Sequence, residues 1–257
     1  MKIAMSSLLF SQKPLADALR SIERLGIRYV DVGALQGWCH IQPADLMKNP
    51  ESESRALRHL LNETQLEVVA LNAGIHAPEL DQWRALVALA HQFDVGVITL
   101  PTRRSGTRLV QEVERLQRLV EIAGRQGVRL GVETHIGTLT EDPETALALV
   151  HSVPGLGLTL DVSHYYCNSF EEAAEVLIPF VYHVHMRDGG RGSDNIQLPM
   201  GRGLVDFAHW FALLRNAQYQ GNVTVEYIDL GGIQFDPTES AIECYRLCQT
   251  MREGFPL

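Results

Sequence analysis

The sequence lacks long apolar runs, and cysteine is scarce in it. None of its 257 residues belongs to an apolar stretch that approaches the roughly 20 residues of a membrane-spanning helix, so we expect no membrane partner. The four cysteines, Cys39, Cys167, Cys244 and Cys248, are scattered without the framework of a disulfide-rich protein. Because free cysteines are typical of a reducing compartment, we expect a cytoplasmic protein.

Positive charge is also in deficit. The chain has 22 Lys and Arg against 31 Asp and Glu, and its net charge is −9. An acidic surface repels phosphate backbones, so we expect no nucleic-acid partner. The short apolar stretch near the N-terminus is interrupted by Ser6 and Ser7 and has no cleavage site, so we expect no signal peptide.

Short β-rich runs alternate with amphipathic helical stretches along the whole chain. The pattern predicts strands at residues 2–6, 29–33, 66–72, 95–100, 128–133, 156–161, 181–185 and 223–227. It predicts helices at residues 14–25, 51–63, 79–93, 107–126, 143–152, 170–178, 207–217 and 238–252. Alternating strands and helices form a parallel sheet, and units of about 32 residues favour an α/β fold of the (β/α)8 TIM-barrel type. A doubly wound open sheet is the alternative. Because no linker interrupts the pattern, we expect a single domain over residues 1–257.

Each of the last four predicted strands ends in or near an ionisable side chain. These side chains are Glu133, Asp161, His185 and Glu226. Parallel strands that are covered on both faces are usually apolar throughout, so such endings are informative. The alternation of side chains along a strand places all four on the inner face. The carboxyl ends of barrel strands carry the active sites of this fold, so we predict that the four converge there.

Three carboxylates and one imidazole in a single pocket are suitable ligands for a divalent cation. Without a cation the carboxylates would raise one another's pKa. An oxygen-rich set with one nitrogen suits Mn²⁺ or Mg²⁺, with Co²⁺ as a further option, and does not suit a thiolate-rich zinc site. We therefore predict one divalent metal ion bound by Glu133, Asp161, His185 and Glu226. The competing interpretation is four unrelated surface residues at strand ends.

Other polar and aromatic residues lie near the ends of the predicted strands. His135 and His164 follow two of them, and His183 lies on the same face as His185. By itself, His135 or His183 is more typical of a hydrogen-bonded support than of a ligand, and His183 would orient a ligand. Trp38, in a loop, either walls the pocket or packs on the barrel rim.

Several segments together resemble the xylose isomerase-like superfamily of TIM barrels. They are VETH at 132–135, LDVSH at 160–164, HVHMRD at 183–188, VEY at 225–227 and a loop, LPMGRGLVDF, at 198–207. The closest group is the sugar phosphate isomerases and epimerases, which includes D-tagatose 3-epimerase and hydroxypyruvate isomerase and is related to endonuclease IV. The resemblance covers nearly the whole chain in order and is strongest from 128 to 228.

The resemblance implies roles for individual residues. It implies that Glu133, Asp161, His185 and Glu226 bind the metal and that Glu133 and Glu226 also move protons on opposite faces of the substrate. It implies that His164 binds the substrate, and we expect further substrate contacts from His135, Arg187, Trp38 and His76. The chain departs from the common family pattern at Asp31, Arg187 and Met200. These departures bear on the identity of the substrate more than on the binding of the metal.

The expected function is that of a divalent-metal-dependent isomerase or epimerase. Its substrate would be a small sugar or sugar-like hydroxy-carbonyl compound, and two glutamates would transfer a proton through an enediolate. Return of the proton to the same carbon epimerises the substrate and return to the neighbouring carbon isomerises it, and the sequence does not choose between them. A homodimer or a homotetramer is compatible with this interpretation.

Three alternatives remain at this point. The first is a metal-dependent lyase or dehydratase on a keto-sugar or an inosose-type polyol, because the same site would remove a proton next to a carbonyl. The second is an endonuclease IV-like DNA-repair enzyme, which is disfavoured because residues 99–102 lack a histidine and residues 192–197 lack an Asp-x-His pair. The third is a binding module without catalysis, whose ligand binding would survive removal of the metal.

Overall fold

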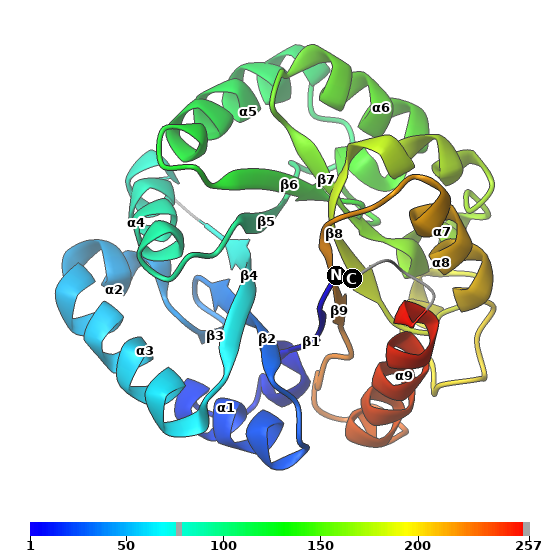
Figure 1. The fold of residues 1–257 in the computed structure, drawn as a ribbon. Helices are drawn as coiled ribbons and strands as arrows, with labels where there is room; N and C mark the ends of the chain where they lie inside the picture. The colour runs from blue at the N-terminus through cyan, green and yellow to red at the C-terminus, as the bar shows by residue number, and fades with distance from the viewer. Residues whose placement is uncertain (76–78, 254–257) are drawn as a thin grey trace.

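The computed structural model describes residues 1–75 and 79–253, and it shows a closed barrel of parallel strands (Figure 1). The eight parallel strands are β1 (Ile3–Ser6), β2 (Tyr29–Leu35), β4 (Glu67–Gly74), β5 (Val97–Pro101), β6 (Arg129–Glu133), β7 (Gly157–Asp161), β8 (Val181–Met186) and β9 (Asn222–Val225). Their order around the barrel follows the chain, and β1 pairs with both β2 and β9. The predicted TIM barrel is therefore confirmed, and the open sheet is excluded.

Helices form a ring outside the strands (Figure 1). They are α1 (Leu15–Arg24), α3 (Pro50–Thr64), α4 (Glu79–Gln92), α5 (Leu109–Gly124), α6 (Pro143–Ser152), α8 (Phe207–Asn216) and α9 (Pro237–Arg252). Their buried faces cover the barrel, which explains why most strand residues are apolar. Trp83 of α4 is fully buried and donates its indole N–H to the carbonyl oxygen of Leu119 in α5 at 2.9 Å. Across residues 1–75 and 79–253, no helix has the length and apolarity that crossing a membrane requires.

Several elements differ from the sequence prediction. The helix expected at 170–178 is wrong, because residues Ala173–Phe180 form a 3₁₀ helix that contains Pro179, which has no backbone N–H to donate. A helix that was not predicted, α7 (Val162–Asn168), begins directly after β7, where Asp161 accepts a hydrogen bond from the backbone N–H of Ser163. The hairpin strand β3 (Cys39–His40) and helix α2 (Pro43–Lys48) were also not predicted.

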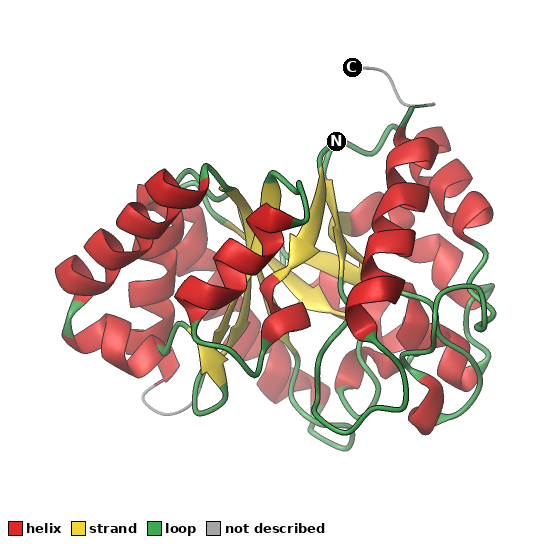
Figure 2. Cartoon of the chain, turned by 90° about the horizontal axis from the view of Figure 1, so that it is seen from below, coloured by secondary structure: helices red, strands yellow, loops and turns green. Residues whose placement is uncertain are grey.

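The barrel interior is partly polar below the carboxyl ends of the strands. Thr99 and Thr159 are joined through their hydroxyl groups at 2.8 Å, and His183 Nε2 lies 2.9 Å from Thr224 Oγ1. All four side chains are buried. Because barrel interiors are usually filled by branched apolar residues, these pairs mark the inside of this barrel as a place for polar chemistry. The long loops gather at the edge of the barrel away from the N-terminus (Figure 2).

Candidate metal centre

The carboxyl ends of β6 to β9 bring the four predicted metal ligands together. Glu133 and Asp161 are the last residues of β6 and β7, His185 is next to last in β8, and Glu226 directly follows β9. All four are buried, and one ligand atom of each lies within 4.8 Å of the others. The structure therefore brings these residues into one cluster, while their role as metal ligands remains a prediction.

His185 lies between the carboxylates of this cluster. Its Nδ1 lies 3.3 Å from Glu133 Oε1 and 3.3 Å from Glu226 Oε2, and its Nε2 lies 3.2 Å from Asp31 Oδ2. Burial alone would lower the pKa of His185, but the carboxylates of Glu226, Asp31 and Glu133 raise it well above its ordinary value. The metal-free ring is therefore protonated, and its Nδ1 proton lies where a cation shared with the two glutamates would lie.

The donor atoms fit a divalent cation in spacing and in charge. Ligands about 2.1 Å from one octahedral ion lie about 3 Å apart, close to the separations around His185 Nδ1. Four buried carboxylates meet here: those of Asp31 and Glu133 contact His185, that of Asp161 pairs with Arg187, and that of Glu226 contacts both. A divalent ion would offset the excess of negative charge, which would otherwise be costly to bury.

Arg187, which directly follows β8, contacts two of the cluster's carboxylates. Its Nη2 lies 2.6 Å from Asp161 Oδ2, and its Nη1 lies 3.2 Å from Glu226 Oε2 and 3.0 Å from the Glu226 carbonyl oxygen. Nε donates to Ser163 Oγ at 2.9 Å, and Nη2 also donates to His164 Nε2 at 3.0 Å. These contacts use all five N–H groups of the guanidinium. Burial and the charge of Arg187 lower the pKa of His164 well below its ordinary value, so this ring is neutral and can accept that hydrogen bond.

Asp161 forms hydrogen bonds both with the first turn of α7 and with Thr134, which directly follows β6. Its Oδ1 accepts hydrogen bonds from the backbone N–H of Ser163 at 2.9 Å and from Ser163 Oγ at 2.6 Å, which caps the first turn of α7. The backbone of Asp161 also exchanges two hydrogen bonds with Thr134 Oγ1, at 2.8 and 3.0 Å. These contacts fix the side chain so that Oδ2 faces the cluster.

A cavity of about 220 Å³ opens at the cluster. Glu133 and Glu226 line it, whereas Asp161 and His185 are not among its lining residues. Much of its wall is apolar and comes from Leu8, Leu35, Trp38, Ala73, Pro101 and Ile228. The cavity therefore gives a small molecule access to two of the four clustered residues.

The structure distributes the predicted substrate-binding residues unevenly. Arg187, His135 and Trp38 line the cavity, and Trp38 is 48% exposed. His164 is buried, and its ring lies 4.1 Å from that of His135, centroid to centroid, so it reaches the cavity only through its neighbours. His76 lies outside the described residues.

Two polar residues that contact the cluster received no role from the sequence. Asn72 Nδ2 donates to Glu226 Oε1 at 2.7 Å, and Asp31 contacts His185. Both are buried polar side chains among the apolar buried residues of β4 and β2. That local contrast is the signal that could have identified them. His40, which follows Trp38 by two residues, is not among the residues that line the cavity, and its Nδ1 lies 2.9 Å from Ser7 Oγ.

The loop that follows β8 is fixed by Asp188. Its Oδ2 accepts hydrogen bonds from the backbone N–H groups of Gly201 at 2.8 Å and Gly203 at 2.9 Å. A Cβ at Gly203 would lie 2.0 Å from Asp188 Oδ1, so only glycine fits there. This contact gives a physical reason for the Gly-x-Gly part of the loop at 198–207.

Comparison with known proteins agrees with this architecture. The sequence profile of the family described as xylose isomerase-like TIM barrel matches residues 19–248. Comparison with curated proteins gives no match. A xylose isomerase-like TIM barrel protein from Mycobacterium smegmatis in complex with magnesium is 16% identical, with 97% of this chain and 96% of that chain covered and a TM-score of 0.79.

Two further solved structures share the fold. A D-tagatose 3-epimerase-like protein is 19% identical, with 98% of this chain and 97% of that chain covered and a TM-score of 0.75. The probable 3-DHS dehydratase involved in petrobactin synthesis from Bacillus anthracis is 18% identical, with 95% of this chain and 98% of that chain covered and a TM-score of 0.69. At these identities the likeness concerns the fold. The profile match covers most of the chain, which therefore belongs to the family of xylose isomerase-like TIM barrels.

Proposed function

We propose that this protein is a divalent-metal-dependent isomerase or epimerase of a small sugar or sugar-like hydroxy-carbonyl compound. One observation carries the proposal. Glu133 and Glu226 line the cavity and also contact His185, whereas Asp161 and His185 contribute no lining. Two carboxylates are thus placed to reach both a substrate and a cation, and the other two residues face the cation only.

The proposed ligands of the ion are Glu133, Asp161, His185 and Glu226. Mn²⁺ or Mg²⁺ suits this set best, with Co²⁺ as a further option, and magnesium in the Mycobacterium smegmatis relative supports the choice. When bound, the ion would polarise the substrate carbonyl and stabilise the negative charge that develops on its oxygen.

Glu133 and Glu226 would move the proton. They come from β6 and β9, with β7 and β8 between them, so their carboxylates approach a substrate from different sides. One would remove the proton from the carbon next to the carbonyl to form an enediolate, and the other would return a proton. Asn72 donates to one oxygen of Glu226 and Arg187 to the other, so the protein fixes the orientation of this carboxylate.

The cavity favours an uncharged substrate. Among the described residues that line it, Arg187 is the one Arg or Lys, and its five N–H groups are all engaged by the protein. A phosphate or carboxylate on the substrate would therefore find no spare guanidinium donor. Trp38 and its apolar neighbours instead offer contact to the C–H face of a sugar.

A dehydratase or lyase is the second candidate, and His135 is the residue that favours it. His135 lines the cavity, and its Nδ1 lies 2.6 Å from the carbonyl oxygen of Ile136, to which it donates. Nε2 of the neutral ring is then an acceptor, which suits binding of a substrate hydroxyl. A protonated His135 would instead help that hydroxyl leave as water.

Deuterium incorporation tests the proposal. The metal content of protein purified without chelator would be measured first. The protein would then be incubated in deuterated water with Mn²⁺ and with ketoses, aldoses or inosose-type polyols. We expect about one ion per chain and deuterium at the carbon next to the carbonyl of the true substrate. A product that has lost water would identify the lyase instead. Exchange that continues at the same rate after the metal is removed would contradict the proposal.

A further inference from the structure

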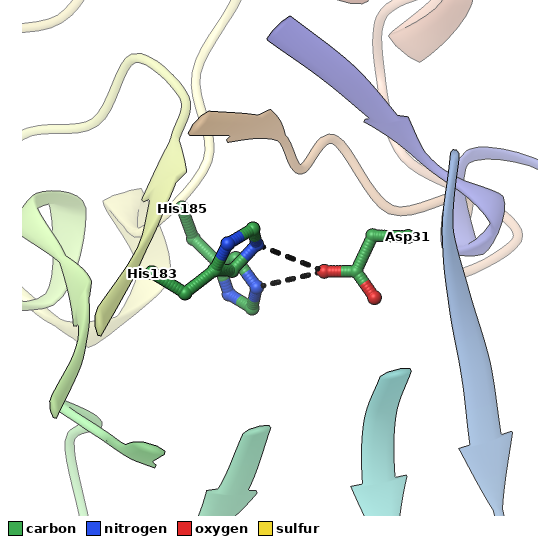
Figure 3. A group of neighbouring side chains, drawn as sticks. All are labelled: Asp31, His183 and His185. Atoms are coloured by element: carbon green, nitrogen blue, oxygen red, sulfur yellow. Dashed lines mark hydrogen bonds and ion pairs between the residues drawn. The ribbon is translucent and has the colours of Figure 1, made fainter. Parts of the chain in front are cut away.

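The buried carboxylate of Asp31 contacts two imidazole rings at once (Figure 3). Its Oδ2 lies 3.2 Å from His185 Nε2 and 3.3 Å from His183 Nε2. Asp31 belongs to β2 and the histidines to β8, and β1 and β9 lie between these strands, so the contact crosses the barrel interior. All three side chains are fully buried, and the sequence assigned no role to Asp31.

The partners of His183 determine which nitrogen carries its proton. His183 Nε2 lies 2.9 Å from Thr224 Oγ1 as well as near Asp31, whereas His183 Nδ1 has no hydrogen-bond partner among the described residues. A buried N–H without a partner costs more than a buried acceptor without one. The Nε2–H tautomer is therefore favoured, and His183 donates toward Asp31.

The same oxygen of Asp31 determines the orientation of His185. A carboxylate is an acceptor only, so the ring nitrogen that faces it must carry the proton. His185 Nε2–H therefore points to Asp31, and Nδ1 points to Glu133 and Glu226, which each lie 3.3 Å away. Rotation of the ring would break the contact to Asp31, and it would turn an N–H toward the cation site.

We propose that Asp31 is a positioning residue, which holds His185 with Nδ1 directed at the cation site and does not itself touch the metal or the substrate. The proposal rests on the metal site of the proposed function. A carboxylate behind a metal-bound histidine fixes its tautomer and increases its strength as a ligand. His183, held by Thr224, fixes Asp31 Oδ2 in turn, so the positioning chain runs from β9 through β8 to β2.

The test is the affinity for Mn²⁺, measured by titration calorimetry on the metal-free protein. Asp31→Asn keeps the size of the side chain but removes its charge, and we expect the dissociation constant to rise by about 10- to 100-fold. Glu112→Gln is the matched control, because Glu112 is an equally buried carboxylate that pairs with Arg115 on α5. This control should bind Mn²⁺ within about twofold of the wild-type protein.

A spectroscopic measurement tests the orientation without a variant. Nitrogen-15 spectra of the histidine rings in the Mg²⁺-loaded wild-type protein should show His185 with a proton on Nε2 and none on Nδ1. A proton on Nδ1, or Mn²⁺ binding by a folded Asp31→Asn protein that equals the wild type, would overturn the role of Asp31 while leaving the metal site intact. A wild-type protein that binds no divalent ion would overturn both this role and the proposed function.

Discussion

The two halves of the barrel present different chemistry to the same cavity. The half formed by β6 to β9 contributes the cluster Glu133, Asp161, His185 and Glu226. The half formed by β1, β2, β4 and β5 contributes the apolar side chains Leu8, Leu35, Ala73 and Pro101 at or near the strand ends. Among the described residues that line the cavity, both carboxylates, Glu133 and Glu226, come from the first half. Under the proposed function, the second half would exclude water and orient a substrate, and the fold would divide the two tasks.

Two of the polar contacts between the apolar half and the charged half reach the cluster itself. Asn72 of β4 donates to Glu226, and Asp31 of β2 contacts His185. Each contact restrains a residue that we propose as a metal ligand. Under the proposed function the two halves therefore differ in role: the charged half would carry the reactive groups, and the apolar half would support them and form a wall of the cavity.

The largest expected effect is the loss of a reactive group from the charged half. Glu226→Gln removes the negative charge but keeps the size of the side chain, so we expect turnover to fall by about 10²- to 10⁴-fold. Turnover of the substrate identified by deuterium exchange is the measurement. Glu121→Gln, on the exposed surface of α5, is the control and should turn over normally. Near-normal turnover by Glu226→Gln would contradict the assignment of the charged half as the reactive one.

Replacement of Arg187, the positively charged side chain that pairs with Asp161 and Glu226, tests the charge balance of the same half. Arg187→Met leaves Asp161 and Glu226 buried without their guanidinium partner, and breaking a buried pair in this way costs about 3–5 kcal/mol. We expect that loss in the free energy of unfolding of the metal-free protein, measured by denaturant titration. Mn²⁺ should stabilise this variant more than it stabilises the wild type.

Arg187→Lys is the conservative counterpart of that variant. It keeps the positive charge but cannot make the same five hydrogen bonds, so its loss of stability should be smaller. Equal stability of the Arg187→Met variant and the wild-type protein, both without metal, would show that the carboxylates of this half need no compensating charge.

The charged half could be predicted from the sequence because it depends on local pattern. The alternation of strands and helices located the barrel, and the period of two along a strand placed Glu133, Asp161, His185 and Glu226 on one face. Neither step requires knowledge of how distant segments pack. Each of these residues lies at or near the carboxyl end of its strand, and these strand ends meet at one rim of the barrel. The arrangement could therefore be predicted from the sequence.

The contacts between the halves could not be predicted in the same way. Asp31 and His185 are 154 residues apart, and so are Asn72 and Glu226, so only the closed barrel brings them together. Helix α7 is absent from the sequence prediction for a different, local reason: the pattern predicts a metal ligand at Asp161, and the same side chain also caps the helix. The five engaged donors of Arg187 likewise depend on residues that are distant in the sequence, at the end of β7, in α7 and directly after β9.

The smallest expected effect concerns the apolar half. Trp38 lines the cavity but is 48% exposed, so it contributes contact area and no reactive group. Loss of its ring in Trp38→Ala should raise KM by about 2- to 10-fold, which corresponds to roughly 0.5–1.5 kcal/mol, and should leave kcat almost unchanged. Trp38→Phe keeps an aromatic face and should recover most of the binding. A fall in kcat as large as that of Glu226→Gln would mean that this half also takes part in the reaction, because a wall that binds substrate and transition state equally changes KM alone.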